Sequence, residues 1–319
     1  MIYFGSKRFF RASESLKRRF PKLGPFCLTR LVRSVLSLDC GMPLWGREAC
    51  YSGGAHQQAD FWKSGIKGPH VLLTFLLFST LVSAADITPL LNRAEVAYQQ
   101  GRWVEARNTL LRASGLADSD EQKQEALGRL GKLNMELLLS PYEQPESIWL
   151  EVQPADTLGK IAKRAGTTIE LLKGMNRLTT NQVRLGRRLK VLYEPFRIEI
   201  DKSENVAILY LGGQVFKQYA VSTGAKANTP VGEFKITDRI VHPDWWHPET
   251  KQLIKYGEEG HRIGTHWLGW DVKGFGIHGT DEPEKIGQAV SLGCVRLRNE
   301  DVAELFVLLP SGTPVKVRE

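Results

Sequence analysis

The sequence predicts a multidomain α+β protein that consists of a helical spacer, a small βααβ module and a mostly β C-terminal domain. Three observations predict this order. Apolar residues recur at intervals of three and four up to residue 139, strand and helix patterns alternate within 149–192, and apolar residues alternate with polar ones from residue 196 onward. We expect a leader followed by three domains, with boundaries at 1–84, 86–140, 148–193 and 196–319.

The net charge of +8 does not indicate a nucleic-acid-binding protein. Residues 1–70 hold 12 Lys/Arg against 4 Asp/Glu, and the remainder of the chain holds 31 of each. A protein that binds a polyanion carries its basic excess on the folded domain. We therefore expect no nucleic-acid partner.

The apolar run 71–82 has the features of a secretory signal peptide, since Lys63 and Lys67 precede it and Ser83 and Ala84 follow it. About 20 apolar residues are needed to span a bilayer as a helix, so this run favours export over a permanent membrane anchor. Signal peptides normally begin a chain, and this one lies far inside it. We hypothesise that translation starts downstream and that residues 1–62 are absent from the working protein, which we expect in the periplasm or cell wall.

Residues 88–139 read as helix, with a break at Gly101. The string AEVAYQQGRWVEARNTLLRA resembles a tetratricopeptide helical hairpin, and residues 121–139 supply a third helix. Because such arrays need about three repeats to bury a continuous core, we interpret the segment as a short spacer or as a docking piece for a protein partner.

Residues 149–192 follow the order strand, helix, helix, strand, and Asp156 occupies the expected N-cap of the first helix. The segment resembles a LysM module, which implies binding of peptidoglycan glycan strands that contain N-acetylglucosamine. Ala155 stands where that family usually has glycine, and we interpret Lys160, Lys163 and Arg164 as a solvated helix face. The expected glycan-binding residues are Asp156, Thr157 and Asn176. The positions that match the family pattern are Asp156, Thr157, Leu158, Ile161, Ala162, Leu171, Asn176, Leu178, Gly186 and Leu189.

The C-terminal domain shows the period of two that is typical of strands, in RIEID, VAILYL and QVFKQYAVS. Gly212 and Gly213 separate two of these runs as a tight hairpin turn. Strands at this spacing predict a mostly antiparallel sheet, with helix returning only near Asp301 to Leu309.

Cys294 is the only cysteine after the leader, because Cys27, Cys40 and Cys50 all precede the predicted cleavage region. An unpaired thiol in an exported chain is either a buried filler or a reactive group. His278 lies sixteen residues before it. A cysteine with a pKa of about 8.5 needs an imidazole or another cationic group to be held as thiolate. Residue types alone leave both interpretations open, and Arg296 is a candidate either for that positive field or for gripping a substrate carboxylate.

Three motifs occur in order, TPVGEF at 229–234, IHGT at 277–280 and SLGCVRLRN at 291–299. Together they resemble the L,D-transpeptidase catalytic domain over residues 196–318. The resemblance implies that Cys294 is the nucleophile and His278 the general base and acid, with the Gly279 carbonyl orienting the imidazole. It also implies that the backbone N–H groups of Gly293 and Cys294 stabilise the oxyanion.

The same resemblance implies the substrate contacts. We expect Arg296, Ser291, Trp246 and Thr280 to contact substrate, with Trp246 on a loop that covers the groove. Leu292 departs from the family pattern, in which many members have histidine. Asp281, Glu282 and Glu284 are interpreted as a solvated loop, and Trp267 and Trp270 as core residues.

The reaction implied is an attack on the carbonyl at the L-centre of the diamino acid at stem position three, with loss of the terminal D-alanine. The acyl group would then pass to an amine of a stem peptide, an outer-membrane protein or a D-amino acid. Transfer to water would make the protein a carboxypeptidase, and loss of activity would leave a peptidoglycan-binding scaffold. This chemistry needs no cofactor. No metal site is expected, since the four histidines that could suggest one form no clean motif: His242, His247, His261 and His266.

Overall fold

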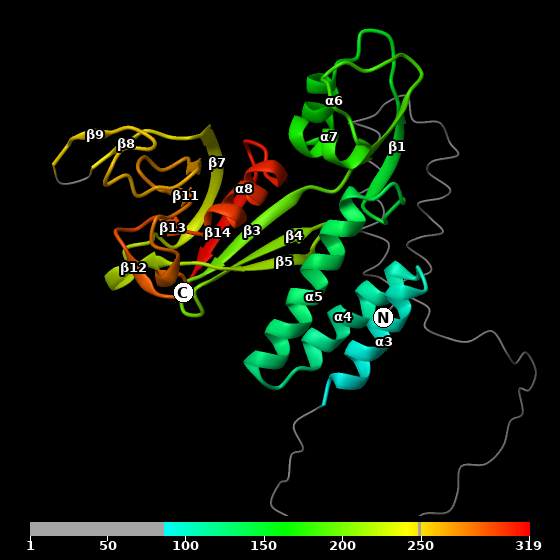
Figure 1. Cartoon of the computed structure of the whole chain (residues 1–319), viewed down its shortest axis with the longest axis horizontal. Coiled ribbons are helices and arrows are strands. Elements are labelled where there is room, and N and C mark those ends of the chain that lie inside the picture. The colour runs from blue at the N-terminus through cyan, green and yellow to red at the C-terminus, as the bar shows by residue number, and fades with distance from the viewer. Residues whose placement is uncertain (1–85, 248–249) are drawn as a thin grey trace, which may run out of the picture.

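A computed structural model describes residues 86–247 and 250–319, so the predicted leader and its apolar run lie outside the described residues (Figure 1). The described chain forms a helical segment, a small module with two helices, and a curled mostly β domain, as the sequence predicts. Within these two ranges, none of the helices combines the length and the apolar character that crossing a membrane requires.

Three antiparallel helices form the N-terminal segment, α3 (Thr88–Gln99), α4 (Trp103–Leu116) and α5 (Asp120–Leu139). The helices pack through small and branched side chains at helical spacing, which is why the periodicity predicts them. Ser119 caps α5 by accepting a hydrogen bond from the Gln122 N–H at 3.2 Å. The residues that share this core include Leu91, Ala94, Ala97, Ala106, Leu110, Leu127 and Leu130.

The small module consists of β1 (Ser147–Glu151), α6 (Leu158–Ala165), α7 (Ile169–Asn176) and β2 (Arg188–Leu192), and β1 pairs antiparallel with β2. The predicted order of strand, helix, helix and strand is confirmed. Its own buried cluster contains Ile148, Leu158, Ile161, Leu172 and Leu189 among others.

The first turn of this module differs in detail from the prediction. Thr157, not Asp156, is the N-cap of α6, because its hydroxyl accepts from the Lys160 N–H at 3.2 Å. The Asp156 carboxylate instead accepts from the Gln153 N–H at 3.0 Å and pairs with Arg164 at 3.3 Å. The interpretation of Arg164 as part of a purely solvated face is therefore wrong. Ala155 has a φ of +65°, a left-handed conformation that explains the glycine usual at this position.

The C-terminal domain is built on an eight-stranded sheet in the order β13-β11-β10-β7-β14-β3-β4-β5. Two neighbouring pairs are parallel, β14 with β3 and β11 with β13, and the other pairs are antiparallel. Its strands are β3 (Phe196–Asp201), β4 (Val206–Leu211), β5 (Gln214–Ala220), β7 (Gly232–Val241), β10 (His266–Trp270), β11 (Gly276–His278), β13 (Val295–Arg296) and β14 (Pro314–Arg318).

Smaller elements surround this sheet. The helix α8 (Asn299–Leu308) begins two residues before the predicted start and contacts β10 and β11. Two short ladders complete the domain, β6 (Thr223–Gly224) with β12 (Ala289–Ser291) and β8 (Trp245–Trp246) with β9 (Leu253–Ile254).

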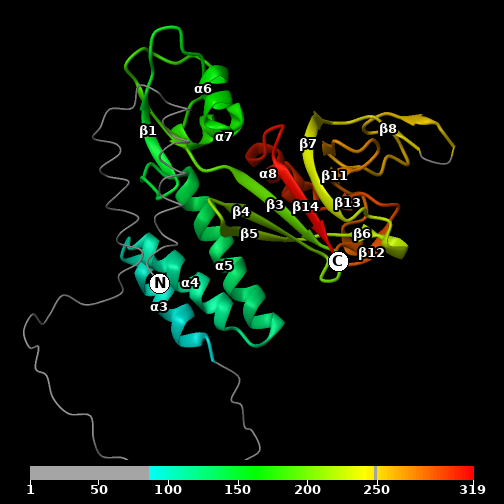
Figure 2. The same ribbon diagram turned by 180° about the vertical axis from the view of Figure 1, so that it is seen from behind.

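The helical segment packs directly on the edge strand of the large sheet, and Figure 2 shows α5 running alongside β5. The Asn134 amide on α5 donates to the Phe216 carbonyl on β5 at 2.8 Å. The neighbouring Lys217 pairs with Glu304 on α8 at 2.6 Å. The first contact joins α5 to the edge strand, which the helix covers, and the second joins that strand to α8.

The LysM-like module is also joined to both neighbours. Leu171 and Met175 of α7 belong to the same buried cluster as Leu138 of α5 and Phe196 of β3. The Thr168 hydroxyl, which caps α7, also donates to a backbone carbonyl of α8. Each part keeps its own buried cluster, and these side chains of α5 and α7 add to the core of the large sheet, so the three parts are packed together.

Candidate active site

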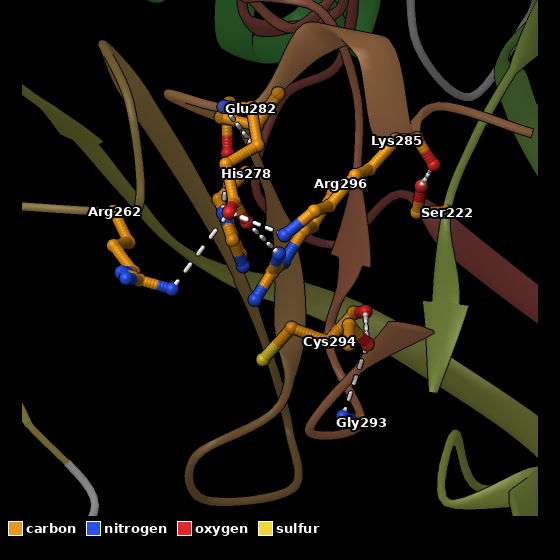
Figure 3. A network of polar contacts seen from close by, with 11 residues as sticks. Ser222, Arg262, His278, Glu282, Lys285, Gly293, Cys294 and Arg296 are labelled. Carbon is orange, nitrogen blue, oxygen red and sulfur yellow. Dashed lines mark hydrogen bonds and ion pairs between the residues drawn. The ribbon is translucent and has the colours of Figure 1, made fainter. Parts of the chain in front are cut away.

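Cys294 and His278 reach the same side of the sheet from neighbouring segments. His278 ends β11, and Cys294 stands in the turn between β12 and β13. Because β11 and β13 pair in parallel, with His278 opposite Arg296, the segment after Cys294 runs beside the histidine (Figure 3). The imidazole is buried, and the thiol is half-buried with its Sγ 3.3 Å from the Gly274 carbonyl oxygen.

The His278 ring is held in one tautomer. Its Nδ1 lies 2.6 Å from the Gly279 carbonyl oxygen, which can only accept a hydrogen bond, so the ring proton resides on Nδ1. The Nε2 atom then has a lone pair with which to accept a proton. Trp267 stacks on the ring, with centroids 5.7 Å apart and an interplanar angle of 20°. The indole expected in the core thus forms a wall of the site.

Burial keeps both groups uncharged at rest. It lowers the pKa of His278 to about 4, against the smaller opposing effect of the hydrogen bond to Gly279. Burial also raises the pKa of the Cys294 thiol to about 11, and the nearby Arg296 offsets only part of this rise. These directions favour the un-ionised thiol in the resting site, so the thiol held ionised by an adjacent imidazole or cation stays a prediction. The thiol and the imidazole line the same cavity, and a neutral thiol needs a base to accept its proton when it attacks.

Ser291 shapes the turn that carries the cysteine. Its hydroxyl donates to the Cys294 carbonyl at 2.6 Å and accepts from the Gly293 N–H at 3.1 Å. The Gly293 N–H is therefore already engaged, although the resemblance implied it as an oxyanion donor. Gly293 has a φ of +140°, and a Cβ there would approach the Phe275 ring to 2.9 Å.

A cavity of about 460 Å³ opens over the two groups. Polar atoms converge at its base from Ser291, Cys294, His278 and Arg296, and most of its wall is apolar. This combination is typical of a small-molecule or peptide subsite. Trp246 and Leu292 also line the cavity and are 64% and 66% exposed. Trp246, which we expected on a loop that covers the groove, thus lies at the cavity. The apolar wall comes from Ile240, Pro243, Trp245, Ile263, Trp267 and Phe275.

Thr280 does not line this cavity, contrary to the prediction of a substrate contact. It is 2% exposed, its hydroxyl accepts from the Glu282 N–H at 3.0 Å, and its carbonyl accepts from the Asn299 amide at 2.9 Å. The side chain thus stabilises the loop that follows His278.

Glu282 is the residue of the site that the sequence interpretation missed. Its carboxylate pairs with Arg296 at 3.3 Å, with Arg262 at 3.9 Å and with Lys285. A glutamate among other acidic residues looks like a solvated loop in the sequence, and the three cations come from different segments. No local signal could have identified this cluster.

The expected glycan-binding residues are used inside the module. The Asn176 amide donates to the carbonyls of Leu172 at 2.9 Å and Lys190 at 2.8 Å, and its oxygen accepts from the Lys190 N–H at 2.7 Å. Thr157 and Asp156 make the turn contacts described above. These three side chains hold the fold of the module, and their role as direct glycan contacts stays a prediction.

The histidines of the covering loop make contacts with rings and backbone. His242 stacks on Tyr256 with centroids 4.1 Å apart, and the Nε2 of His261 lies 2.8 Å from the Pro243 carbonyl oxygen. Within 86–247 and 250–319, no three His, Cys, Asp or Glu side chains group in a way that could hold a metal ion.

Comparisons with known proteins agree with this geometry. Residues 195–317 match the L,D-transpeptidase catalytic domain (YkuD), and residues 150–192 match the LysM domain. The relative named L,D-transpeptidase YkuD from Bacillus licheniformis is 33% identical over 175 residues, which are 52% of this chain and 96% of that protein. The relative named L,D-transpeptidase YqjB from Bacillus subtilis is 35% identical over 132 residues, which cover 40% of this chain and 72% of the relative.

Solved structures give a more distant likeness. An L,D-transpeptidase from Mycobacterium smegmatis is 18% identical, with a TM-score of 0.33, and the match covers 42% of this chain and 64% of that one. The chain thus spans less than two thirds of that structure. The Bacillus licheniformis relative, in contrast, is matched over nearly its whole length. A half-buried thiol, a base in a fixed tautomer and this sequence match lead to one conclusion, which is that the chain belongs to the L,D-transpeptidase family.

Proposed function

We propose that this protein is a peptidoglycan L,D-transpeptidase that acts through a Cys294 thioester. The donor would be a tetrapeptide stem, cleaved at the L-centre of the diamino acid at position three with release of D-alanine. The observation that carries the proposal is that Cys294 and His278 line one cavity, with Nδ1 of the ring fixed by the Gly279 carbonyl. That arrangement leaves Nε2 as a base for the thiol.

In the first half-reaction the thiol attacks the scissile carbonyl while His278 Nε2 accepts its proton. The carbonyl oxygen becomes an oxyanion, for which the backbone N–H of Cys294 is the donor we favour, because Gly293 already donates to Ser291. His278 then passes the proton to the departing amine, the C–N bond breaks, D-alanine leaves, and the acyl group remains on sulfur as a thioester.

In the second half-reaction an acceptor amine attacks the thioester. His278 takes a proton from that amine and returns it to the departing sulfur, so the enzyme recovers its neutral thiol and neutral imidazole. The burial that lowers the pKa of His278 suits this role, because the ring gives up an accepted proton readily. The acceptor would be a stem peptide, an outer-membrane protein or a D-amino acid. Water in its place would give the carboxypeptidase reaction.

The LysM module would keep the protein on its polymeric substrate. Both matched domains are associated with peptidoglycan, which supports a location at the cell wall and glycan strands as partners. Attachment to glycan raises the local concentration of stems near the cavity. Export through the apolar run at 71–82 and a protein partner at the helical segment belong to the same proposal.

The test is incubation of the purified protein with a disaccharide tetrapeptide, followed by mass spectrometry of the products and of the intact protein. We expect free D-alanine and a protein mass increased by the acyl group, with neither in Cys294→Ala. Full turnover by that variant would refute the nucleophile. Retention on sacculi without any D-alanine release would indicate a noncatalytic scaffold. Tripeptide as the only product would indicate the carboxypeptidase.

A further inference from the structure

Three positive side chains converge on one carboxylate at the wall of the catalytic cavity. Arg262 and Arg296 line the cavity together with Cys294 and His278, and both reach Glu282 (Figure 3). Lys285 pairs with the same carboxylate from the outer side. Three positive charges against one negative charge leave this wall with a net positive charge.

Glu282 does not fill the hydrogen-bonding capacity of these cations. Its contact with Arg296 joins one Nη1 atom to one oxygen at 3.3 Å, whereas a guanidinium binds a carboxylate best through two parallel hydrogen bonds. The Nε of Arg296 is buried and has no hydrogen-bond partner in the described residues. Arg262 stands 3.9 Å from Glu282, beyond hydrogen-bond distance, and its side chain is 52% exposed. Both guanidinium groups can therefore take a further acceptor.

We propose that Arg262, Glu282 and Arg296 form a subsite that recognises a free carboxylate on the donor stem next to the scissile bond. This inference rests on the proposed function and assigns its substrate preference. Arg262 and Arg296 bind the carboxylate. Glu282 is a positioning residue that holds both cations at the cavity wall and competes with the ligand for them. A donor in which this carboxylate is amidated loses the charge and one acceptor, so the subsite discriminates against it.

Two carboxylates of a stem could supply this group, the C-terminal carboxylate of the D-alanine and the side-chain carboxylate of the diamino acid. The experiment uses three donor peptides, one with both carboxylates free, one amidated at the C-terminus and one amidated at the diamino acid. Release of D-alanine or D-alaninamide is followed by mass spectrometry to obtain kcat and KM. We expect one of the two amidations to raise KM roughly tenfold, and which one does so identifies the source.

Variants assign the preference to this cluster. Arg262→Gln should raise KM for the free acid roughly tenfold, leave KM for the discriminated amide within about twofold, and so remove the preference. Glu282→Gln should lower KM for the free acid roughly threefold, because it removes the competing charge but keeps the shape. Lys316 is exposed on β14 and does not line the cavity. Lys316→Gln also removes one positive charge, and it should leave KM unchanged for both the free acid and the discriminated amide.

Binding to the Cys294→Ala variant separates this inference from the proposed function, because it requires no turnover. Calorimetry should show the free acid binding roughly tenfold more tightly than the discriminated amide. Equal binding and equal KM for all three donors, with D-alanine still released, would overturn the subsite and leave the transpeptidase proposal intact. Tighter binding of the free acid with no release from any donor would support the subsite and refute the proposed reaction.

Discussion

The side-chain amide of Asn299 occupies the space that a Cβ atom on Gly279 would need. An ideal Cβ there would lie 2.1 Å from Asn299 Oδ1, and one on Gly264 would lie 2.2 Å from the same atom. The amide also accepts from the Thr265 N–H at 3.1 Å. Asn299, at the start of α8, therefore clamps the segment whose carbonyl orients His278.

This clamp makes Gly264 intolerant of a side chain. Gly264 has a φ of +64°, so Gly264→Ala adds backbone strain to the contact with Asn299, and we expect the free energy of unfolding to fall by about 3 kcal/mol. Chemical denaturation measures this loss. The matched control is Gly257→Ala, which has a φ of +86° with open space around it and should cost about 1 kcal/mol. Equal losses in the two variants would show that the contact with Asn299 adds nothing.

The resting thiol should react as an un-ionised group. Because burial raises the pKa of Cys294 to about 11, we expect its alkylation by iodoacetamide to accelerate steadily from pH 7 to pH 10. The rate is followed by mass spectrometry of the peptide that contains Cys294. Free cysteine titrates near pH 8.5 and serves as the reference. A rate that is already maximal at pH 7 would instead indicate a thiolate–imidazolium pair.

Neutral burial of His278 should make the protein sensitive to mild acid. Its pKa is about 4 in the folded state and 6.5 when unfolded, so the unfolded chain binds more protons between these values. The contribution is fully present above pH 6.5 and is lost as the pH falls toward 4, with a total size of about 3 kcal/mol. Denaturation at pH 7 and pH 5 measures about 2 kcal/mol of this total, because only the part of the window above pH 5 is crossed. His278→Gln should lose less stability over this interval than the wild type, and equal losses would contradict the assignment.

Lys190 joins the module to the helical segment. The side chain is fully buried, and its ammonium donates to the carbonyls of Leu137, Leu138 and Ser140 at 3.0, 3.2 and 2.9 Å, where α5 ends. Burial lowers the pKa of Lys190 to about 8, which still leaves the group mainly protonated at pH 7. These contacts supply a donor to the carbonyls of Leu138 and Ser140 at the helix end, whereas the Leu137 carbonyl also accepts from Ser140 and Gln144.

Lys190→Met keeps the length of the side chain and removes its donors. We expect the free energy of unfolding to fall by about 3 kcal/mol, because the carbonyls of Leu138 and Ser140 lose this donor. Thermal and chemical denaturation measure the loss. The exposed Lys316→Met should change stability by less than about 0.5 kcal/mol. A change this small at Lys190 would show that its three hydrogen bonds add no net stability.

Much of the architecture follows from the sequence because periodicity reports which side of an element is buried. The helical repeat up to residue 139 and the alternation after residue 196 correspond to α3 to α5 and to the large sheet. The predicted N-cap of α6, Asp156, lies one residue before the observed N-cap, Thr157. Both residue types are good N-caps, and only the backbone conformation at the start of the helix decides between them.

The site was predictable to the extent that its residues lie in continuous motifs. Cys294, His278, Gly279 and Ser291 lie in such motifs, and the structure brings them together. Glu282 and Asn299 act through partners that are distant in sequence, and the charge states of the thiol and the imidazole depend on burial. Neither long-range contact nor burial depth is encoded in local residue patterns.

The shared core of α5, α7 and the large sheet also has a consequence for work on a polymer. A flexible tether would let the catalytic domain sample stems over a wide range around an anchoring point. Here Leu171 and Met175 pack into the same interior as the strands below Cys294. The module and the catalytic domain would therefore move over such a polymer as one rigid unit.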